Sequence, residues 1–229
     1  MPSDSETSFR IHDLRFSEIV GQQPTIELLA EHSDYPFAHE AGVFFPESNS
    51  LYITSNRCIG SDSEQKVNIT RVDLNKRPVT FEECLTDIPM ANGAINYGKN
   101  DVLFCGQGSM TQPSGLYKMS TLSYKSELLK SDFYGREFNS VNDVVVHTDG
   151  SVWFTDPNYG FEQGYRPIPS LPNQVYRWCP RTGNIRAMAD GFGKPNGICF
   201  SPDEKVVYIT DTDRVRGDGT IDDQRVSSM

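Results

Sequence analysis

Short runs of apolar and β-branched residues recur along the chain in pairs, and a polar turn separates the two members of each pair. The pairs follow one another about every 50 residues. The first runs are residues 42–45, 93–96, 144–147 and 197–200, and the second runs are residues 51–54, 102–105, 152–155 and 207–210. Two strand-like runs joined by a short polar turn predict a β-hairpin. The pattern therefore predicts four antiparallel hairpins and little helix.

A third strand-like run follows the hairpin in each of the first three repeats, at residues 67–73, 115–118 and 174–178. A unit of about four strands that recurs every 50 or so residues is typical of a β-propeller, in which four-stranded sheets, the blades, surround a central channel. The alternative is a non-repeating β-sandwich whose strands happen to be evenly spaced. Both are all-β folds, and the side chains that align between repeats favour the propeller.

One polar side chain recurs about ten residues before the second strand of every repeat. The residues at this position are Glu40, Asn92, Asn142 and Asn196. The first strand of each propeller blade lines the channel, so we expect the four side chains to converge on one axis. A ring of one carboxylate and several amide oxygens suits Ca²⁺ or another divalent cation that prefers oxygen, whereas zinc prefers nitrogen and sulfur. The alternative is that each asparagine only forms the turn at a strand start.

Composition narrows the partners that this chain can have. Its 229 residues carry a formal charge of −10, which disfavours nucleic acid and anionic membrane surfaces as partners. No segment has the length and hydrophobicity of a membrane span, and the first thirty residues lack the apolar core of a secretory signal. The five cysteines are widely spaced and form no C-x-x-C pair. We therefore expect reduced thiols and a cytoplasmic protein.

Three further residues are candidates for the same site. Asp156 and Tyr159 follow the second strand of the third repeat, where they could line a substrate pocket. The alternative for Asp156 is that its carboxylate fixes the turn that follows the strand. His39 precedes Glu40 and could orient its carboxylate, although neighbouring residues on a strand face opposite ways.

Two long segments carry a resemblance to a known family. Residues 142–160, NDVVVHTDGSVWFTDPNYG, and residues 194–212, KPNGICFSPDEKVVYITDT, resemble the gluconolactonase/SMP-30 (regucalcin-like) family, especially its fungal and bacterial lactonohydrolase branch. The resemblance extends from about residue 37 to the C-terminus. It implies a six-bladed propeller with a catalytic divalent metal, usually Ca²⁺. Carried over to this chain, the family's metal ligands correspond to Glu40, Asn142 and Asn196, and Asn92 corresponds to a position that more often faces substrate.

The length of the chain differs from that of a six-bladed propeller. At about 52 residues per blade, six blades need roughly 310 residues, so this chain holds about three and a half blades and lacks the aspartate that the family supplies from a later blade. We expect an N-terminal segment at residues 1–36, in which residues 25–29 could add a blade-closing strand, and a partial, truncated propeller at residues 37–229. Open sheet edges would favour self-association.

The function implied by the resemblance is calcium-dependent opening of a lactone, with a small-molecule lactone as the partner. The metal would polarise the carbonyl for attack by water, with Glu40 and Asn142 as the catalytic residues. Motifs for a serine nucleophile, a zinc protease or a phosphate-binding loop are absent from the sequence. The alternative is a non-catalytic propeller that binds calcium or another protein. The sequence does not specify which lactone is the substrate.

Overall fold

The computed structural model describes residues 9–21, 23–60 and 64–229, and the chain forms two compact units, residues 1–31 and 32–229. The first unit contains helix α1 (Leu14–Val20), which the strand pattern did not predict. The Asp13 carboxylate accepts the N–H of Arg15 at 2.9 Å, and Gly21 ends the helix with a φ of 78°. Residues 25–29, the suggested blade-closing strand, have no strand conformation. The boundary at residue 36 stays a prediction.

The second unit is a partial β-propeller, as the repeat pattern predicted. Its first blade contains β1 (Glu40–Phe45), β2 (Ser50–Thr54), β5 (Ile69–Asp73) and β6 (Thr80–Glu83). The second contains β7 (Ala91–Asn96), β8 (Asp101–Gly106), β9 (Gly115–Ser120) and β10 (Ser126–Lys130). The third contains β13 (Val144–Val146), β14 (Val152–Asp156), β15 (Gln174–Trp178) and β16 (Ile185–Ala189). Only β17 (Pro195–Phe200) and β18 (Val207–Asp211) belong to the fourth.

Each predicted hairpin is present, and all strand pairs within the blades are antiparallel. Three smaller elements lie in the loops between blade strands. The two-stranded pairs are β3 (Cys58–Ile59) with β4 (Gln65–Lys66) and β11 (Asp132–Phe133) with β12 (Arg136–Glu137), and helix α2 spans Tyr159–Glu162. No helix in the described residues is long and apolar enough to cross a membrane.

Two hydrophobic clusters lie between neighbouring blades. Alternate residues of β8 face opposite ways, so Val102 and Phe104 join a cluster with β1 and β2, whereas Leu103 and Cys105 join one with β13 to β15. All four side chains are fully buried. The second blade is thus covered on both faces, which explains why its central strand reads as a continuous apolar run.

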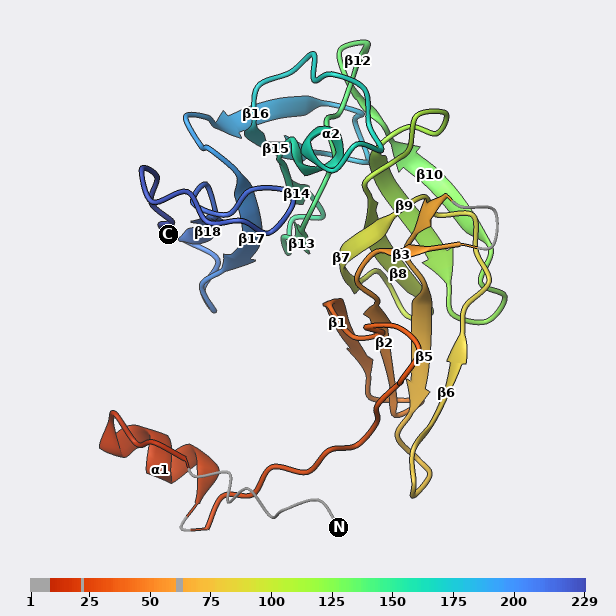
Figure 1. The fold of residues 1–229 in the computed structure, drawn as a ribbon, viewed down its shortest axis with the longest axis vertical. Coiled ribbons are helices and arrows are strands. Elements are labelled where there is room, and N and C mark those ends of the chain that lie inside the picture. Colours follow the sequence, from red (N-terminus) through yellow and green to blue (C-terminus); the bar gives the residue numbers. More distant parts are fainter. Residues whose placement is uncertain (1–8, 22, 61–63) are drawn as a thin grey trace. The chain divides into compact units, whose positions relative to one another are not determined.

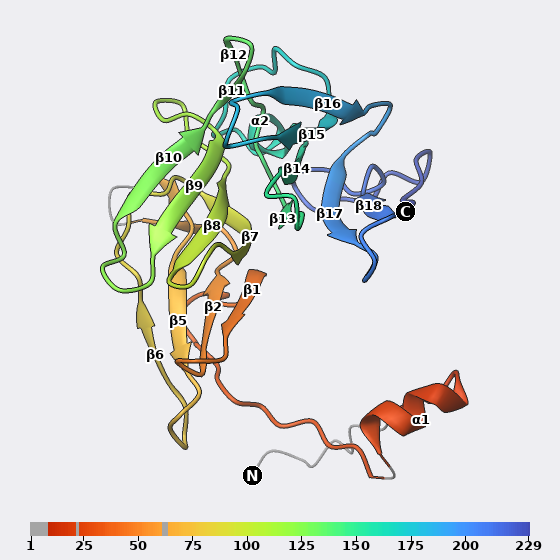
Figure 2. The same ribbon diagram turned by 180° about the vertical axis from the view of Figure 1, so that it is seen from behind.

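The innermost strands of the blades lie next to one another. Strand β1 contacts β7, β7 contacts β13, and β13 contacts β17 (Figures 1 and 2). The outer strands β6, β10 and β16 lie away from this centre. The sheets do not close into a ring, in agreement with the expected three and a half blades. Self-association through the open edges stays a prediction.

Candidate functional site

A cavity of about 340 Å³ lies where the innermost strands begin. Five of the six residues that the sequence singled out for metal or substrate line it together: Glu40, Asn92, Asn142, Tyr159 and Asn196. They come from four different blades, as the common position in the repeat predicted. Their roles as ligands and substrate contacts remain predictions, but the geometry brings their side chains to one place.

In three of the four blades, a local irregularity lies in the strand pair that carries the ring residue. The register of strand pairing shifts between Glu40 and Val43, between Ala91 and Ala94, and between Pro195 and Ile198. Such bulges bend a strand and change the direction of a side chain, and they are common beside active sites. In the first blade Ala41 adopts a φ of 58°. His39 precedes β1, so the alternation of side chains along a strand does not apply to it, and both His39 and Glu40 line the cavity.

Hydrogen bonds between blades fix the positions of the asparagines. The Thr54 hydroxyl donates to the carbonyl oxygen of Asn92 at 3.2 Å, and the Thr155 hydroxyl donates to that of Asn196 at 2.6 Å. The N–H of Gly93 donates to the carbonyl oxygen of Asn142 at 2.9 Å. Each asparagine backbone is therefore held by a group from the neighbouring blade, and the spacing of the ring depends on how the blades pack.

The amide oxygens of Asn92 and Asn196 have no hydrogen-bond donor in the described part of the chain. The Asn92 Oδ1 atom is buried and finds no hydrogen-bond partner among the described residues. Asn196 donates through Nδ2 to the Thr212 hydroxyl at 3.2 Å, which leaves its Oδ1 available, and the Tyr159 hydroxyl lies 2.6 Å from the same Thr212 oxygen. A buried acceptor without a donor is costly unless a cation or a water molecule satisfies it.

Two carboxylates at and near the cavity, those of Glu40 and Asp143, have raised pKa values. Burial raises the pKa of the Glu40 carboxyl, the nearby His39 lowers it, and the charge of Asp143 raises it again. Burial also raises the pKa of Asp143, while the N–H groups of Ile198 and Val144, each 2.9 Å from its carboxylate, lower it. Two carboxylates that repel each other in a partly desolvated place would be stabilised by a positive charge.

The donor set points to a hard cation. Among the residues that the structure describes, no three His, Cys, Asp or Glu side chains gather as a metal cluster. A bound ion would therefore take one carboxylate, from Glu40, and amide oxygens from Asn142, Asn196 and Asn92, with water completing the shell. Ca²⁺ accepts six to eight such oxygen ligands, so these residues fit it.

Asp156 lies outside this cavity, which differs from the suggestion that it contacts substrate. Its side chain is fully buried, and its carboxylate accepts the N–H groups of Asn139 at 3.0 Å and of Ser140 at 2.9 Å. The carboxylate therefore has a structural role, but it holds residues 139 and 140 rather than the turn after its own strand, which the alternative interpretation named. Residues 139 and 140 stand three and two positions before Asn142, so Asp156 holds the segment that presents Asn142 to the cavity.

The burial of Asp156 predicts a dependence of stability on pH. Burial raises the pKa of its carboxyl to about 7, although the N–H groups of Asn139 and Ser140 lower it. The folded protein then binds more protons than the unfolded chain between pH 4 and pH 7, so the stabilisation from this group is present at pH 4 and is lost as the pH rises through 7. Asparagine does not titrate, so only the wild type loses this stabilisation. Between pH 5 and pH 7 we expect the free energy of unfolding of the wild type to fall by about 2 kcal/mol relative to that of Asp156→Asn, measured by urea unfolding.

The exposed Asp203 provides the control for this measurement. Its pKa is lowered, first of all by a hydrogen bond from the Ser201 hydroxyl, so it stays ionised in both states across this range. The Asp203→Asn variant should therefore follow the wild type in parallel from pH 5 to pH 7. The same parallel course for Asp156→Asn would contradict the assignment.

Residues from several loops complete the lining of the cavity. Its remaining lining includes Arg57, Gln163 and residues 215–219. The Arg57 guanidinium donates to Gln65 Oε1 at 2.7 Å, and Gln65 Nε2 donates to the carbonyl oxygen of Gln163 at 3.2 Å. A repeat pattern carries no signal for such contacts, because the loops differ between blades. The bracing threonines, in contrast, recur at the end of three of the four second strands and could have been identified.

Comparisons with known proteins place these observations in context. Residues 10–217 match the family described as the SMP-30/gluconolactonase/LRE-like region. Lactonohydrolase oryL of Aspergillus oryzae is 34% identical over 206 residues, which cover 85% of this chain and 44% of that protein. The chain spans about half the length of the curated fungal relatives that it matches.

Solved structures have the same fold. XC5397 from Xanthomonas campestris, described as a gluconolactonase, superposes with a TM-score of 0.64 at 24% identity, covering 78% of this chain and 56% of that one. A regucalcin from Agrobacterium tumefaciens, described as a calcium-binding protein, superposes with a TM-score of 0.50 at 17% identity, covering 79% of this chain and 52% of that one. At these identities the likeness concerns the fold.

Proposed function

Because the chain belongs to the SMP-30/gluconolactonase/LRE-like family, we propose that it hydrolyses a lactone with the help of a divalent cation, Ca²⁺, held in the 340 Å³ cavity. The observation that carries the proposal is the convergence of Glu40, Asn92, Asn142 and Asn196 from four blades. The name lactonohydrolase of the fungal relative supports the lactone, and the calcium-binding description of the regucalcin supports the ion.

Three residues of this chain would hold the ion, and a fourth faces the same space. We assign Glu40, Asn142 and Asn196 as ligands, and Asn92 as a contact to the ion or to the substrate. When bound, the ion supplies a Lewis acid that draws electron density from the lactone carbonyl and stabilises the oxyanion formed when water adds. This chemistry needs no protein nucleophile, in agreement with the absence of a nucleophile motif from the sequence.

The remaining roles follow from the positions of the side chains. Glu40 is the carboxylate of the ring, so it would accept the proton of the attacking water. The Tyr159 hydroxyl, held by Thr212, and the Asn92 amide would orient the lactone. Gln163 and residues 215–219 would restrict access of bulk water to the cavity.

The test combines metal binding with turnover. The purified chain should melt several degrees higher in millimolar Ca²⁺ than in EDTA, because a ligand that binds only the folded state stabilises it. Hydrolysis of δ-gluconolactone, followed by acid release against a protein-free blank, should depend on the same metal. A melting temperature that does not change with Ca²⁺ would contradict the proposed metal site. Melting that depends on Ca²⁺ without any turnover of the lactone would contradict the proposed hydrolysis.

A further inference from the structure

A short hairpin in residues 215–221 separates the candidate site from a second, larger cavity. Val215 pairs with Ile221 in an antiparallel bridge. Between them, Arg216, Gly217 and Asp218 line both the 340 Å³ cavity and a neighbouring one of about 500 Å³. The position of this hairpin therefore sets the size of the space above the four oxygens.

Two side chains at the end of helix α2 hold both backbone groups of Gly217. Glu162 Oε2 accepts the Gly217 N–H at 2.7 Å, and Gln163 Nε2 donates to the Gly217 carbonyl oxygen at 2.9 Å. A side chain at Gly217 would not fit, because its Cβ would lie 2.6 Å from Glu162 Cβ and 3.1 Å from Gln163 Cγ. We call this pair of side chains, Glu162 and Gln163, the clamp.

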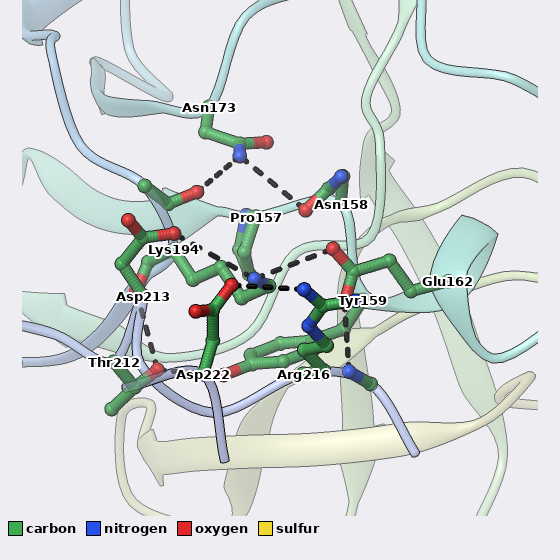
Figure 3. Close-up of polar contacts among 12 residues, drawn as sticks. Pro157, Asn158, Tyr159, Glu162, Asn173, Lys194, Thr212, Asp213, Arg216 and Asp222 are labelled. Atoms are coloured by element: carbon green, nitrogen blue, oxygen red, sulfur yellow. Dashed lines mark hydrogen bonds and ion pairs between the residues drawn. The ribbon is translucent and has the colours of Figure 1, made fainter. Parts of the chain in front are cut away.

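A buried lysine holds the clamp in turn. The side chain of Lys194 is only 6% exposed, and its Nζ lies 3.3 Å from Glu162 Oε1 and 3.7 Å from Asp213 Oδ1 (Figure 3). Lys194 stands two residues before Asn196, so the same segment anchors the clamp and presents a ring oxygen. A buried charge of this kind is tolerated only when carboxylates compensate it.

The rest of the charged network is paired as well. Arg225 lies 2.6 Å from Asp213, and Arg216 lies 2.9 Å from Asp222. With Lys194, Glu162 and Asp218, these residues make three cations and four carboxylates around the larger cavity. Because each of the three cations has a carboxylate partner, the network is suited to holding the hairpin in place.

We propose that the clamp holds the 215–221 hairpin over the four-oxygen cavity and thereby excludes lactones with a bulky substituent. This inference rests on the proposed function. With the hairpin held, only a compact single-ring lactone fits the smaller cavity. With the hairpin released, the two cavities join, and a lactone carrying a second sugar ring can extend into the polar larger one. Glu162 and Gln163 are thus positioning residues that set specificity.

The experiment compares a compact and a bulky substrate in clamp variants. The probes are δ-gluconolactone and lactobionolactone, the gluconolactone that carries a galactose. In Glu162→Ala we expect the ratio of their kcat/KM values, compact over bulky, to fall about tenfold, and in Gln163→Ala, which leaves every charge in place, to fall severalfold. The matched control is Glu127→Ala, which removes an exposed carboxylate paired with Lys118 at 2.8 Å on the outer strand β10.

The readouts separate positioning from a general loss of stability. A merely structural role would lower turnover of both lactones by one factor and leave their ratio unchanged, and that outcome would overturn the proposal. The rise in melting temperature with Ca²⁺ should be the same in all variants, because neither clamp residue belongs to the ring. Tryptic cleavage after Arg216 should be at least about tenfold faster in both clamp variants than in the wild type and in Glu127→Ala.

Failure of the proposed function gives a different result from failure of the clamp. If the wild-type chain hydrolyses neither lactone, the proposed function is wrong, and the cleavage rates then decide the clamp alone. Equal rates of cleavage after Arg216 in wild-type and clamp variants would show that Glu162 and Gln163 do not hold the hairpin. If Glu162→Ala does not fold, Gln163→Ala decides the substrate ratio.

Discussion

Replacement of Glu40 by glutamine is expected to reduce lactone hydrolysis at least about 100-fold and to abolish the rise in melting temperature with Ca²⁺. The substitution keeps the size of the side chain and one oxygen, and it removes the negative charge of the only carboxylate in the ring. An oxygen-ligated cation depends on such a charge, since amide oxygens alone compensate none of the ion's own charge. The partly buried position of Glu40 enlarges the effect, because water cannot substitute for the lost charge.

The measurement needs two readouts and one control. Initial rates with δ-gluconolactone report turnover, and calorimetric titration with Ca²⁺ reports binding. Glu47 lies exposed in the turn between β1 and β2 of the same blade, so Glu47→Gln should leave both unchanged. Full Ca²⁺ affinity in Glu40→Gln would show that Glu40 is not a ligand and would contradict the proposed metal site.

Replacement of Asp156 by alanine is expected to lower the free energy of unfolding by about 3–5 kcal/mol. The variant leaves the N–H groups of Asn139 and Ser140 in a buried place without an acceptor, and each such group costs about 1–3 kcal/mol. The Arg166 guanidinium, which donates to the carbonyl oxygens of Phe138 and Asn139 at 3.0 Å, would remain as the second anchor of this loop.

Urea unfolding at pH 7 measures this effect, with Asp203→Ala as the exposed control. That control should leave the free energy of unfolding almost unchanged, because the Asp203 side chain is exposed. Loosening of residues 139 and 140 should also weaken Ca²⁺ binding, because the proposed ligand Asn142 belongs to the same segment. A change below about 1 kcal/mol in Asp156→Ala would mean that the carboxylate does not hold the loop as the hydrogen bonds indicate.

The inner strands of the fold could be predicted because the burial of their faces requires a pattern of apolar residues in the sequence. Strand β8 is covered on both faces and reads as an apolar run, whereas β1 alternates between buried and exposed residues. The outer strand β6 is exposed along its whole length, and helix α1 buries none of its residues. Neither element has a face that packing must keep apolar, so periodicity gives no signal for them.

The ring residues of the site could be predicted because they follow the repeat of the blades. Glu40 and the three ring asparagines share one position in the repeat, and equivalent positions in successive blades face one centre. The role of Asp156 could not be read from its spacing, because its partners lie 16 and 17 residues earlier in a loop. The contacts of Gly217 span 54 and 55 residues and join the segment after β14 to the segment after β18. Such long-range contacts depend on the folded loops.

The hydrogen bonds that join neighbouring blades have a consequence for ion discrimination. The carbonyl of Asn92 is held by Thr54 and that of Asn196 by Thr155, so the separation of the ring oxygens is set by the angle between adjacent sheets. Ca²⁺ takes oxygens at about 2.3–2.6 Å and tolerates irregular shells, whereas Mg²⁺ demands an octahedron at about 2.0–2.1 Å. Substitutions in the apolar layers between sheets, remote from any oxygen, should therefore alter the preference between these two ions.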